Sequence, residues 1–434
     1  MSDKKNSTTK KSKHQQIIEI VDQVSSISEK LGIAHQTIED GYLDGRIIHI
    51  DGQRLTNFGS CSYMGLELDP RLKAGAIDAV NRYGSQFASS RAYLSVTLYT
   101  EIEELLERIF EQKIILGPTV TLGHQSNIPV LVEDNDVVIM DSQVHESVQA
   151  AVQLLKLRNI AVHTVKHNDV NALETKIKSL KDKYNKIWYM ADGVYSMYGD
   201  FAPMDELKTL MDTYPQFYCY LDDAHGMGWT GRHGAGYVKS KVWSHPQMIL
   251  ITSIAKSFAA CGGVTCYPEE EMRRIVKNCG GTMIFSGPIQ PPVLGAAIAS
   301  AKIHLSDEVF VRQSELKKKI KYFNTTAKLY DLPLVHESLS PIFFIGVGKP
   351  EVGYNMVKRL MKLGYYLNLA VFPAVPYKNT GLRIPITMHH TYEDIESLLK
   401  TIAEQLPKAL AESNSNIDEV IGAFQMEQMY KLPE

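Results

Sequence analysis

The stretch Met248-Ile-Leu-Ile-Thr-Ser-Ile-Ala-Lys256-Ser-Phe-Ala-Ala-Cys-Gly-Gly263 decides the fold class of this chain. Its leading apolar residues are typical of a buried parallel strand. A lysine at the polar end of such a strand is partly desolvated, which lowers its pKa toward the free amine that carbonyl chemistry needs. The hydroxyl of Ser253 is suited to a phosphate, and the glycine pair lets backbone approach a ligand. Taken alone, Lys256 is more simply explained as a solvated loop lysine. Other stretches of the chain favour a reactive lysine instead.

Two further apolar stretches end in polar residues in the same way. One runs from Phe217 into Asp222, Asp223 and His225 and then a glycine-rich turn, and the other runs from Ile187 into Asp192. In parallel α/β sheets, ligand-binding groups gather at the carboxyl ends of the strands. The three strand ends therefore predict one shared site in an α/β domain.

These stretches resemble the α-oxoamine synthase family of pyridoxal-phosphate enzymes, which includes aminooxononanoate synthase, 5-aminolevulinate synthase, 2-amino-3-ketobutyrate CoA ligase and serine palmitoyltransferase. The matching motifs are Asp-Asp-Ala-His before a Gly-rich turn (222–236), Ser-x-x-Lys before Gly-Gly (253–263), and Asp-Gly-Val-Tyr-Ser-Met-x-Gly-Asp (192–200). The resemblance extends from about Asp51 to about Leu406. It implies fold type I of the pyridoxal-phosphate-dependent transferases, similar to aspartate aminotransferase, with a large mostly parallel sheet domain and a smaller C-terminal α+β domain.

The resemblance also implies pyridoxal 5'-phosphate as cofactor and assigns catalytic roles to four residues. Lys256 is expected to bind the cofactor aldehyde and then to act as the base at the substrate α-carbon. Asp222 is expected to pair with the pyridine nitrogen, His225 to bond the phenolic oxygen, and His145 to stack on the ring. The further expected cofactor-binding residues are Leu122, Gly123, His124, Asp192, Ser196, Ser253 and Ser286.

Two of these expectations concern the cofactor phosphate. Gly123 and His124 occupy the position of a family glycine and aromatic residue at a helix start, where backbone N–H groups and the helix dipole favour a phosphate. A plain helix N-terminus is the alternative explanation. Ser286 lies in a Phe-Ser-x-x-x-x-Pro-Pro segment. In the family this segment brings a hydroxyl to the phosphate of the second subunit, which implies a homodimer with active sites at the interface.

Three residues are expected to contact the substrate. Arg383 lies in a Leu-Arg-Ile-x-x-Thr motif that matches the family's carboxylate anchor, and its planar fork pairs two-pronged with a carboxylate. Cys61 stands where many relatives carry an Asn that helps hold this carboxylate, and a thiol is a poor hydrogen-bond donor. Arg91 ends a loop similar to one that reaches the neighbouring active site in the family. The identity of the amino acid stays open.

The reaction implied is the condensation of an amino acid with an acyl thioester, carried by CoA or an acyl carrier protein, with decarboxylation to an α-amino ketone. An aminotransferase or carbon–carbon lyase on the same fold would use nearly the same site residues. The motif at 192–200 and the stretch from Pro373 to Thr391 favour the synthase. A non-catalytic partner subunit is a third alternative, and the presence of Lys256, Asp222 and His225 argues against it.

Composition sets the broad class of the protein. The 434 residues are 44% hydrophobic and carry a formal net charge of −3, which argues against nucleic acid or an anionic membrane as the main partner. No run approaches the roughly 18 apolar residues needed to span a bilayer. The five cysteines are scattered, without a Cys-x-x-Cys pair, so we expect reduced thiols, no metal site and a cytoplasmic location.

The chain divides into four expected segments. Residues 1–13 form a basic tail, expected to be disordered, which lacks the apolar region of a signal peptide. Residues 14–56 hold a helix with apolar residues at helical spacing and a hairpin around Asp51-Gly52. Residues 57–304 are expected to form the large cofactor-binding domain, and residues 305–434 the small C-terminal domain.

Overall fold

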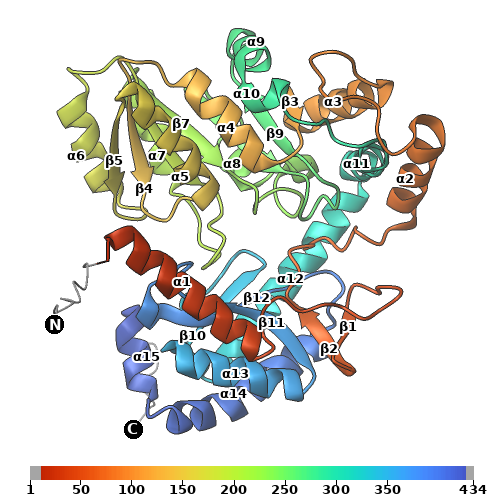
Figure 1. The fold of residues 1–434 in the computed structure, drawn as a ribbon, viewed down its shortest axis with the longest axis vertical. Helices are drawn as coiled ribbons and strands as arrows, with labels where there is room; N and C mark the ends of the chain where they lie inside the picture. The colour runs from red at the N-terminus through yellow and green to blue at the C-terminus, as the bar shows by residue number, and fades with distance from the viewer. Residues whose placement is uncertain (1–10, 427–434) are drawn as a thin grey trace, which may run out of the picture.

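The computed structural model describes residues 11–426, which form two β-sheets with helices packed around them (Figure 1). The larger sheet has seven strands in the order β3-β9-β8-β7-β6-β4-β5. Strand β9 is antiparallel to both of its neighbours, and β8, β7, β6, β4 and β5 run parallel to one another. The strands are β3 (Lys113–Gly117), β4 (Val137–Asp141), β5 (Ala161–Val165), β6 (Ile187–Asp192), β7 (Phe217–Asp222), β8 (Met248–Ser253) and β9 (Gly263–Tyr267).

The central strands of this sheet are buried on both faces, which explains their continuous apolar runs. Successive side chains of a strand point to opposite faces. In β6, Tyr189 and Ala191 accordingly enter one hydrophobic core, whereas Trp188 and Met190 enter another. The first core is completed by α2 (Pro70–Tyr83), α3 (Thr97–Phe110), α6 (Val170–Leu180), α7 (Met204–Thr213), α8 (Tyr237–Lys241) and α11 (Pro291–His304), and the second by α4 (Val120–Leu131), α5 (Glu146–Gln153) and α9 (Glu270–Cys279).

The smaller sheet has five strands in the order β1-β2-β11-β12-β10 and combines both ends of the chain. The expected hairpin around Asp51-Gly52 is present as β1 and β2. Strand β2 pairs in parallel with β11, so the hairpin extends the C-terminal sheet instead of forming a separate unit. The strands are β1 (Ile47–Ile50), β2 (Gln53–Phe58), β10 (Ile342–Gly348), β11 (Tyr365–Ala370) and β12 (Thr380–Pro385). The helices of this region are α12 (Glu308–Leu329), α13 (Pro350–Lys362), α14 (Tyr392–Glu412) and α15 (Ile417–Phe424).

The N-terminal helix α1 (Lys13–Lys30) begins inside the segment expected to be a tail, because a capping box starts it at Ser12. Residues 1–10 of that tail, and residues 427–434 of the expected C-terminal domain, lie outside the described residues. Between residues 11 and 426, no helix is both long and apolar enough to cross a membrane. The short remaining helices are α10 (Gly281–Ile284), η1 (Leu154–Arg158), η2 (Arg232–Gly234) and η3 (Tyr377–Asn379).

Candidate active site

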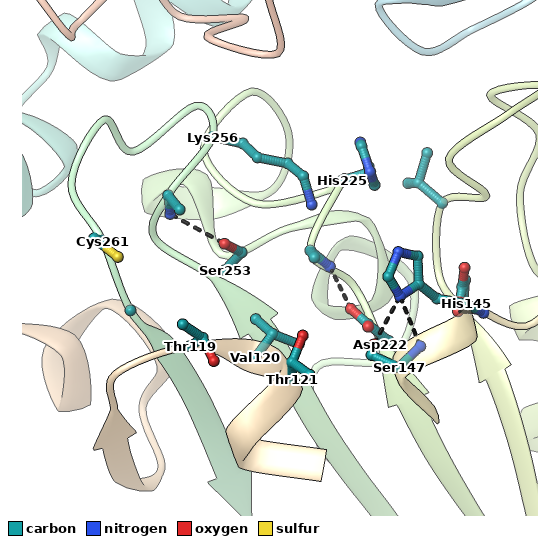
Figure 2. A pocket seen from close by; sticks show the side chains of 15 residues that line it. Thr119, Val120, Thr121, His145, Ser147, Asp222, His225, Ser253, Lys256 and Cys261 are labelled. Atoms are coloured by element: carbon teal, nitrogen blue, oxygen red, sulfur yellow. Dashed lines mark hydrogen bonds between the residues drawn. The ribbon is translucent and has the colours of Figure 1, made fainter. Parts of the chain in front are cut away.

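A cavity of about 220 Å³ lies where β6, β7 and β8 end (Figure 2). Asp192 and Asp222 are paired neighbours at the ends of β6 and β7, and Ser253 ends β8. The parallel register therefore brings together the three strand ends at which the sequence predicts one shared site. The cavity is lined by Thr119, Val120, Thr121, His145, Ser147, Asp192, Val194, Asp222, Ala224, His225, Ser253, Ala255, Lys256, Cys261 and Gly262.

The carboxylate of Asp222 is buried and held by two hydrogen bonds. Oδ1 accepts from the backbone N–H of Ala224 at 2.9 Å, and Oδ2 accepts from Nε2 of His124 at 2.9 Å. Burial alone would raise the pKa of Asp222, but the bond from His124 and the charge of Lys256 outweigh it, so the pKa is lowered. An oriented carboxylate whose pKa is lowered in this way is suited to a protonated ring nitrogen.

Lys256 and His225 face the same cavity from above Asp222 in the view of Figure 2. Burial lowers the pKa of Lys256, which makes the uncharged, nucleophilic amine more accessible near neutral pH. Burial and the nearby Lys256 lower the pKa of His225 well below its ordinary value, so its ring is neutral. Its Nδ1 lies 2.8 Å from the hydroxyl of Tyr63. If that hydroxyl donates to Nδ1, Nε2 carries the proton and is available to an oxygen acceptor.

The opposite end of the cavity is formed by the N-terminus of α4. Oγ1 of Thr119 accepts from the N–H of Leu122 at 3.1 Å and so caps the helix. The first-turn N–H groups of Val120 and Thr121 have no acceptor within the helix. Together with the hydroxyl of Ser253, they form a surface suited to a phosphate (Figure 2).

The glycine pair at the start of β9 allows this arrangement. A Cβ on Gly263 would lie 2.7 Å from the carbonyl carbon of Thr119 and from the backbone nitrogen of Val120. A Cβ on Gly262 would lie 3.1 Å from the carbonyl oxygen of Gly117. These glycines are expected from the sequence to admit a ligand, but the backbone that Gly263 accommodates is the helix N-terminus itself.

Helix α4 begins about one turn earlier than expected, which moves three predicted residues away from the phosphate end. Leu122, Gly123 and His124 are absent from the cavity lining, and Gly123 and His124 are buried within the helix. A threonine is a much better N-cap than a leucine, and Thr119 directly follows Pro118. That signal in the sequence could have identified Thr119 and the two residues after it.

His145 and Asp192 lie side by side at the cavity. Asp192 Oδ1 accepts from the backbone N–H of His145 at 3.1 Å, and Nδ1 of His145 lies 2.7 Å from Oγ of Ser147. Burial lowers the pKa of His145, which favours the neutral ring. Burial and the charge of Asp222 raise the pKa of Asp192 well above its ordinary value. His145 thus presents an uncharged ring beside the ionised Asp222.

Arg383, Ser196 and Cys61 are brought together next to the cavity, but none of the three is among its lining residues. Arg383 lies on β12 and is only 6% exposed. Its Nε donates to the backbone carbonyl of Ser196 at 2.6 Å, and its Nη atoms lie 3.7 and 3.8 Å from Sγ of Cys61. Ser196 thus contributes its backbone carbonyl to this group of residues.

Arg91 and Ser286 also lie outside the cavity lining of their own chain. Arg91 forms an ion pair with Glu103 at 2.8 Å and stacks over the ring of Tyr99, with Cζ 3.8 Å from the ring centroid. The hydroxyl of Ser286 donates to the backbone carbonyl of Thr282. A single chain thus uses both side chains for internal contacts.

One supporting residue was not anticipated from the sequence. His167 lies between two carboxylates, with Nδ1 2.9 Å from Oδ1 of Asp141 and Nε2 2.7 Å from Oδ2 of Asp200. Burial alone would lower the pKa of His167, but the two carboxylates raise it to about 9. The charged imidazole ties the end of β4 to the turn that carries Ser196. A lone histidine after a short strand gave no sign of this role.

The chain is similar to one protein family and to several named proteins. Residues 55–402 match the model of the aminotransferase class I and II family. The 8-amino-7-oxononanoate synthase of Thermosipho melanesiensis is 30% identical over 359 residues, covering 82% of this chain and 89% of the relative. A serine palmitoyltransferase of Sphingobacterium spiritivorum is 28% identical over 372 residues, covering 84% and 90%. In fold, the chain is similar to a serine palmitoyltransferase from S. paucimobilis bound to PLP and myriocin, with a TM-score of 0.83 at 22% identity, covering 93% of this chain and 100% of that chain.

Proposed function

This chain belongs to the aminotransferase class I and II family and, within it, to the α-oxoamine synthases, and from that premise we propose that it condenses an amino acid with an acyl thioester. The products are an α-amino ketone, CO2 and the free thiol of the acyl carrier. The observation that supports this proposal is the single cavity that combines the amine of Lys256, the ionised Asp222 and the N-terminus of α4. These three groups suit the aldehyde, the ring nitrogen and the phosphate of pyridoxal 5'-phosphate. When bound, that cofactor supplies an electron sink for negative charge at the amino-acid α-carbon.

Each group of the chain has a defined task in this proposal. Asp222 keeps a proton on the ring nitrogen, and the first turn of α4 with Ser253 holds the phosphate. Lys256 would hold the aldehyde, and its amine would be the base that takes the proton from the amino-acid α-carbon. His145 and His225 line the same cavity, where His145 would pack against the ring and His225 would donate to its phenolic oxygen. Asp192 lines the same cavity and holds His145 in place, because its carboxyl group accepts a hydrogen bond from the His145 backbone N–H.

Arg383 is proposed to hold the carboxylate of the amino acid. It is the buried cation that small-domain strand β12 brings beside the cavity, and its planar fork is suited to a carboxylate. Cys61, in contact with the guanidinium, is proposed to shape the same subsite. We propose acyl-CoA as the acyl donor, with the thioester of an acyl carrier protein as the alternative that the assay below distinguishes.

A homodimer is proposed, with Arg91 and Ser286 near the subunit boundary. Two apolar side chains beside these residues are strongly exposed, Tyr93 at 81% and Phe285 at 86%. A hydrogen bond from Ser90 to the carbonyl of Ile284 joins the two segments into one surface. Sedimentation velocity tests this: the wild type is expected to be a dimer, and Phe285→Asp to weaken it. Leu329→Asp, at a 73% exposed position on α12, is the control.

The proposed compartment is the cytoplasm. All five cysteines of the chain lie in its described part and are free thiols, as a reducing environment favours. Selective labelling of thiols in intact cells, before and after permeabilisation, tests this placement. Labelling of Cys261 or Cys279, the two exposed cysteines, before permeabilisation would contradict it.

The activity is tested by the visible absorbance of the purified protein with added pyridoxal phosphate. Titration with single amino acids should shift the band for the true substrate. Adding acyl-CoA, or the corresponding acyl carrier protein thioester, should then produce a transient long-wavelength band and release CO2. Conversion to the pyridoxamine form without a response to either thioester would identify an aminotransferase. A protein that developed no band would contradict the proposed cofactor.

A further inference from the structure

His124 is a fully buried histidine in contact with the carboxylate that faces the proposed cofactor. It lies in the second turn of α4, and its side chain is 0% exposed. Its Nε2 is 2.9 Å from Oδ2 of Asp222, and its Nδ1 is 2.9 Å from the hydroxyl of Tyr220. Because an ionised carboxylate only accepts hydrogen bonds, Nε2 must carry a proton. The ring is therefore fixed from both sides, with its donor directed at Asp222.

The contact continues into a buried polar network on the same helix. Asn127, one turn after His124, donates to the carbonyl of Gly123 at 2.8 Å and to Oγ1 of Thr265 at 3.0 Å. The hydroxyl of Tyr267 donates to Oδ1 of Asn127. These bonds hold α4 against β9, which belongs to the same sheet as β7, and so restrain the position of His124 relative to Asp222.

We infer that His124 is a positioning residue that keeps the Asp222 carboxylate ionised and directed at the ring nitrogen of the cofactor. This inference rests on the proposed function. Asp222 has one oxygen bonded to a backbone N–H and the other to His124, so removing His124 leaves half of a buried carboxylate without a partner. His124 itself does not line the cavity and would not touch the cofactor.

The same helix then serves both ends of the cofactor. The first turn of α4, at Val120 and Thr121, lines the phosphate end of the cavity, and His124 in the next turn supports the carboxylate at the ring end. A displacement of α4 would disturb both ends together. This differs from the role expected from the sequence, in which His124 bound the phosphate through its backbone.

Two amide substitutions separate this role from simple packing. The amide nitrogen of glutamine reaches the position of Nε2, whereas that of asparagine reaches only the position of Nδ1. His124→Gln should therefore keep a donor to Asp222, and His124→Asn should lose it. Tyr220→Phe removes the hydroxyl on the far side of the imidazole without altering the side chain that contacts Asp222. Asn324→Ala, which disrupts a buried hydrogen-bond pair with Ser338 in the small domain, controls for a general loss of stability.

The readouts are the dissociation constant of pyridoxal phosphate, the pH midpoint of its visible band, and the melting temperature of the apoprotein. For His124→Asn, the dissociation constant should rise roughly tenfold to a hundredfold, as expected for losing a hydrogen bond to a charged group. The pH midpoint should rise as well, because a ring nitrogen that is less firmly protonated no longer opposes a positive charge on the bound Lys256 nitrogen. His124→Gln should restore most of both values. Tyr220→Phe should raise the dissociation constant and the pH midpoint by less than His124→Asn does.

The outcomes distinguish the possible failures. A wild-type protein that binds pyridoxal phosphate, together with a folded His124→Asn that matches it in affinity and pH midpoint, would overturn the inference alone. The inference would also be overturned if Asn324→Ala, at an equal loss of melting temperature, reproduced the changes of His124→Asn. If His124→Asn did not fold, the affinity for pyridoxal phosphate and the pH midpoint of His124→Gln and Tyr220→Phe would test the inference instead. A wild type without affinity for pyridoxal phosphate would instead overturn the proposed function.

Discussion

The guanidinium of Arg383 lies against the thiol of Cys61, with its Nη atoms 3.7 and 3.8 Å from Sγ. The two residues come from distant parts of the sequence: Cys61 follows β2 near the start of the chain, and Arg383 lies on β12. A thiol gives a guanidinium a weak, polarisable neighbour, where an amide would offer a strong donor and acceptor. The proposed carboxylate subsite therefore depends almost entirely on the arginine.

Replacing the thiol by an amide should strengthen this subsite. In Cys61→Asn, we expect the KM for the amino acid to fall roughly threefold to tenfold, the effect of one added hydrogen bond, with kcat little changed. Steady-state kinetics at saturating thioester measures both constants. Cys279→Asn, the same change at an exposed thiol, is the control. An unchanged or higher KM in Cys61→Asn would show that the substrate carboxylate does not bind beside Cys61.

Lys256 should be the residue that binds the cofactor covalently. Borohydride reduction of the loaded protein, followed by peptide mass spectrometry, should place the cofactor on Lys256 and nowhere else. Lys239 provides an internal comparison, because burial lowers its pKa to about 8 although its Nζ donates to the carbonyl of Phe110 away from the cavity. In Lys256→Ala the visible band should disappear. Modification of Lys239 in the wild type would show that a lowered pKa, and not the cavity, directs the reaction.

His167 should make the stability of the protein depend on pH. Its pKa is about 9 in the folded chain and about 6.5 in an unfolded chain, so its contribution is complete below pH 6.5. The contribution should be lost as the pH rises through 9, by roughly 3 kcal/mol in total. Urea unfolding between pH 6 and pH 10 measures the difference between the wild type and His167→Asn. A difference that stayed constant over this range would contradict the charged state of the imidazole.

The close approach of Gly263 to the start of α4 should be essential for the phosphate end. In Gly263→Ala, the added Cβ would lie 2.7 Å from backbone atoms of Thr119 and Val120, so one of the two segments must move. We expect a loss of stability of about 1–3 kcal/mol, as for other overpacked sites, and weaker binding of pyridoxal phosphate. Gly281→Ala is the matched control, because its Cβ would meet no atom within 4 Å. Equal cofactor affinity in the two variants would contradict the proposed phosphate position.

The centre of the site could be predicted from the sequence because it depends on strand ends. Asp192, Asp222 and Ser253 each follow a continuous apolar run, and a parallel register brings such ends together. Lys256 and His225 lie within a few residues of those ends. Their distances from one another in space are therefore determined by the sheet, and no knowledge of side-chain packing is needed to place them.

Other parts of the site could not be predicted in this way. The start of α4 depended on which of several small or polar residues capped it, and one turn of difference changed His124 from a phosphate neighbour into a partner of Asp222. The role of His167 depends on two carboxylates that are 26 and 33 positions away in the chain. The Arg91 side chain contacts its own chain because it forms an ion pair with Glu103 on the next helix. Each of these contacts is set by packing between elements, which periodicity does not report.

The pairing of β2 with β11 has a consequence for how the protein is made. Thr56 pairs with Tyr365, so a strand near the start of the chain cannot pair until a strand about 300 residues later has been made. During synthesis on the ribosome, the seven strands of the large sheet emerge before β11 and can assemble first. The small sheet, and with it Arg383 on β12, can form only when the end of the chain has been translated. All residues that line the cofactor cavity therefore leave the ribosome before the residue proposed to bind the amino acid.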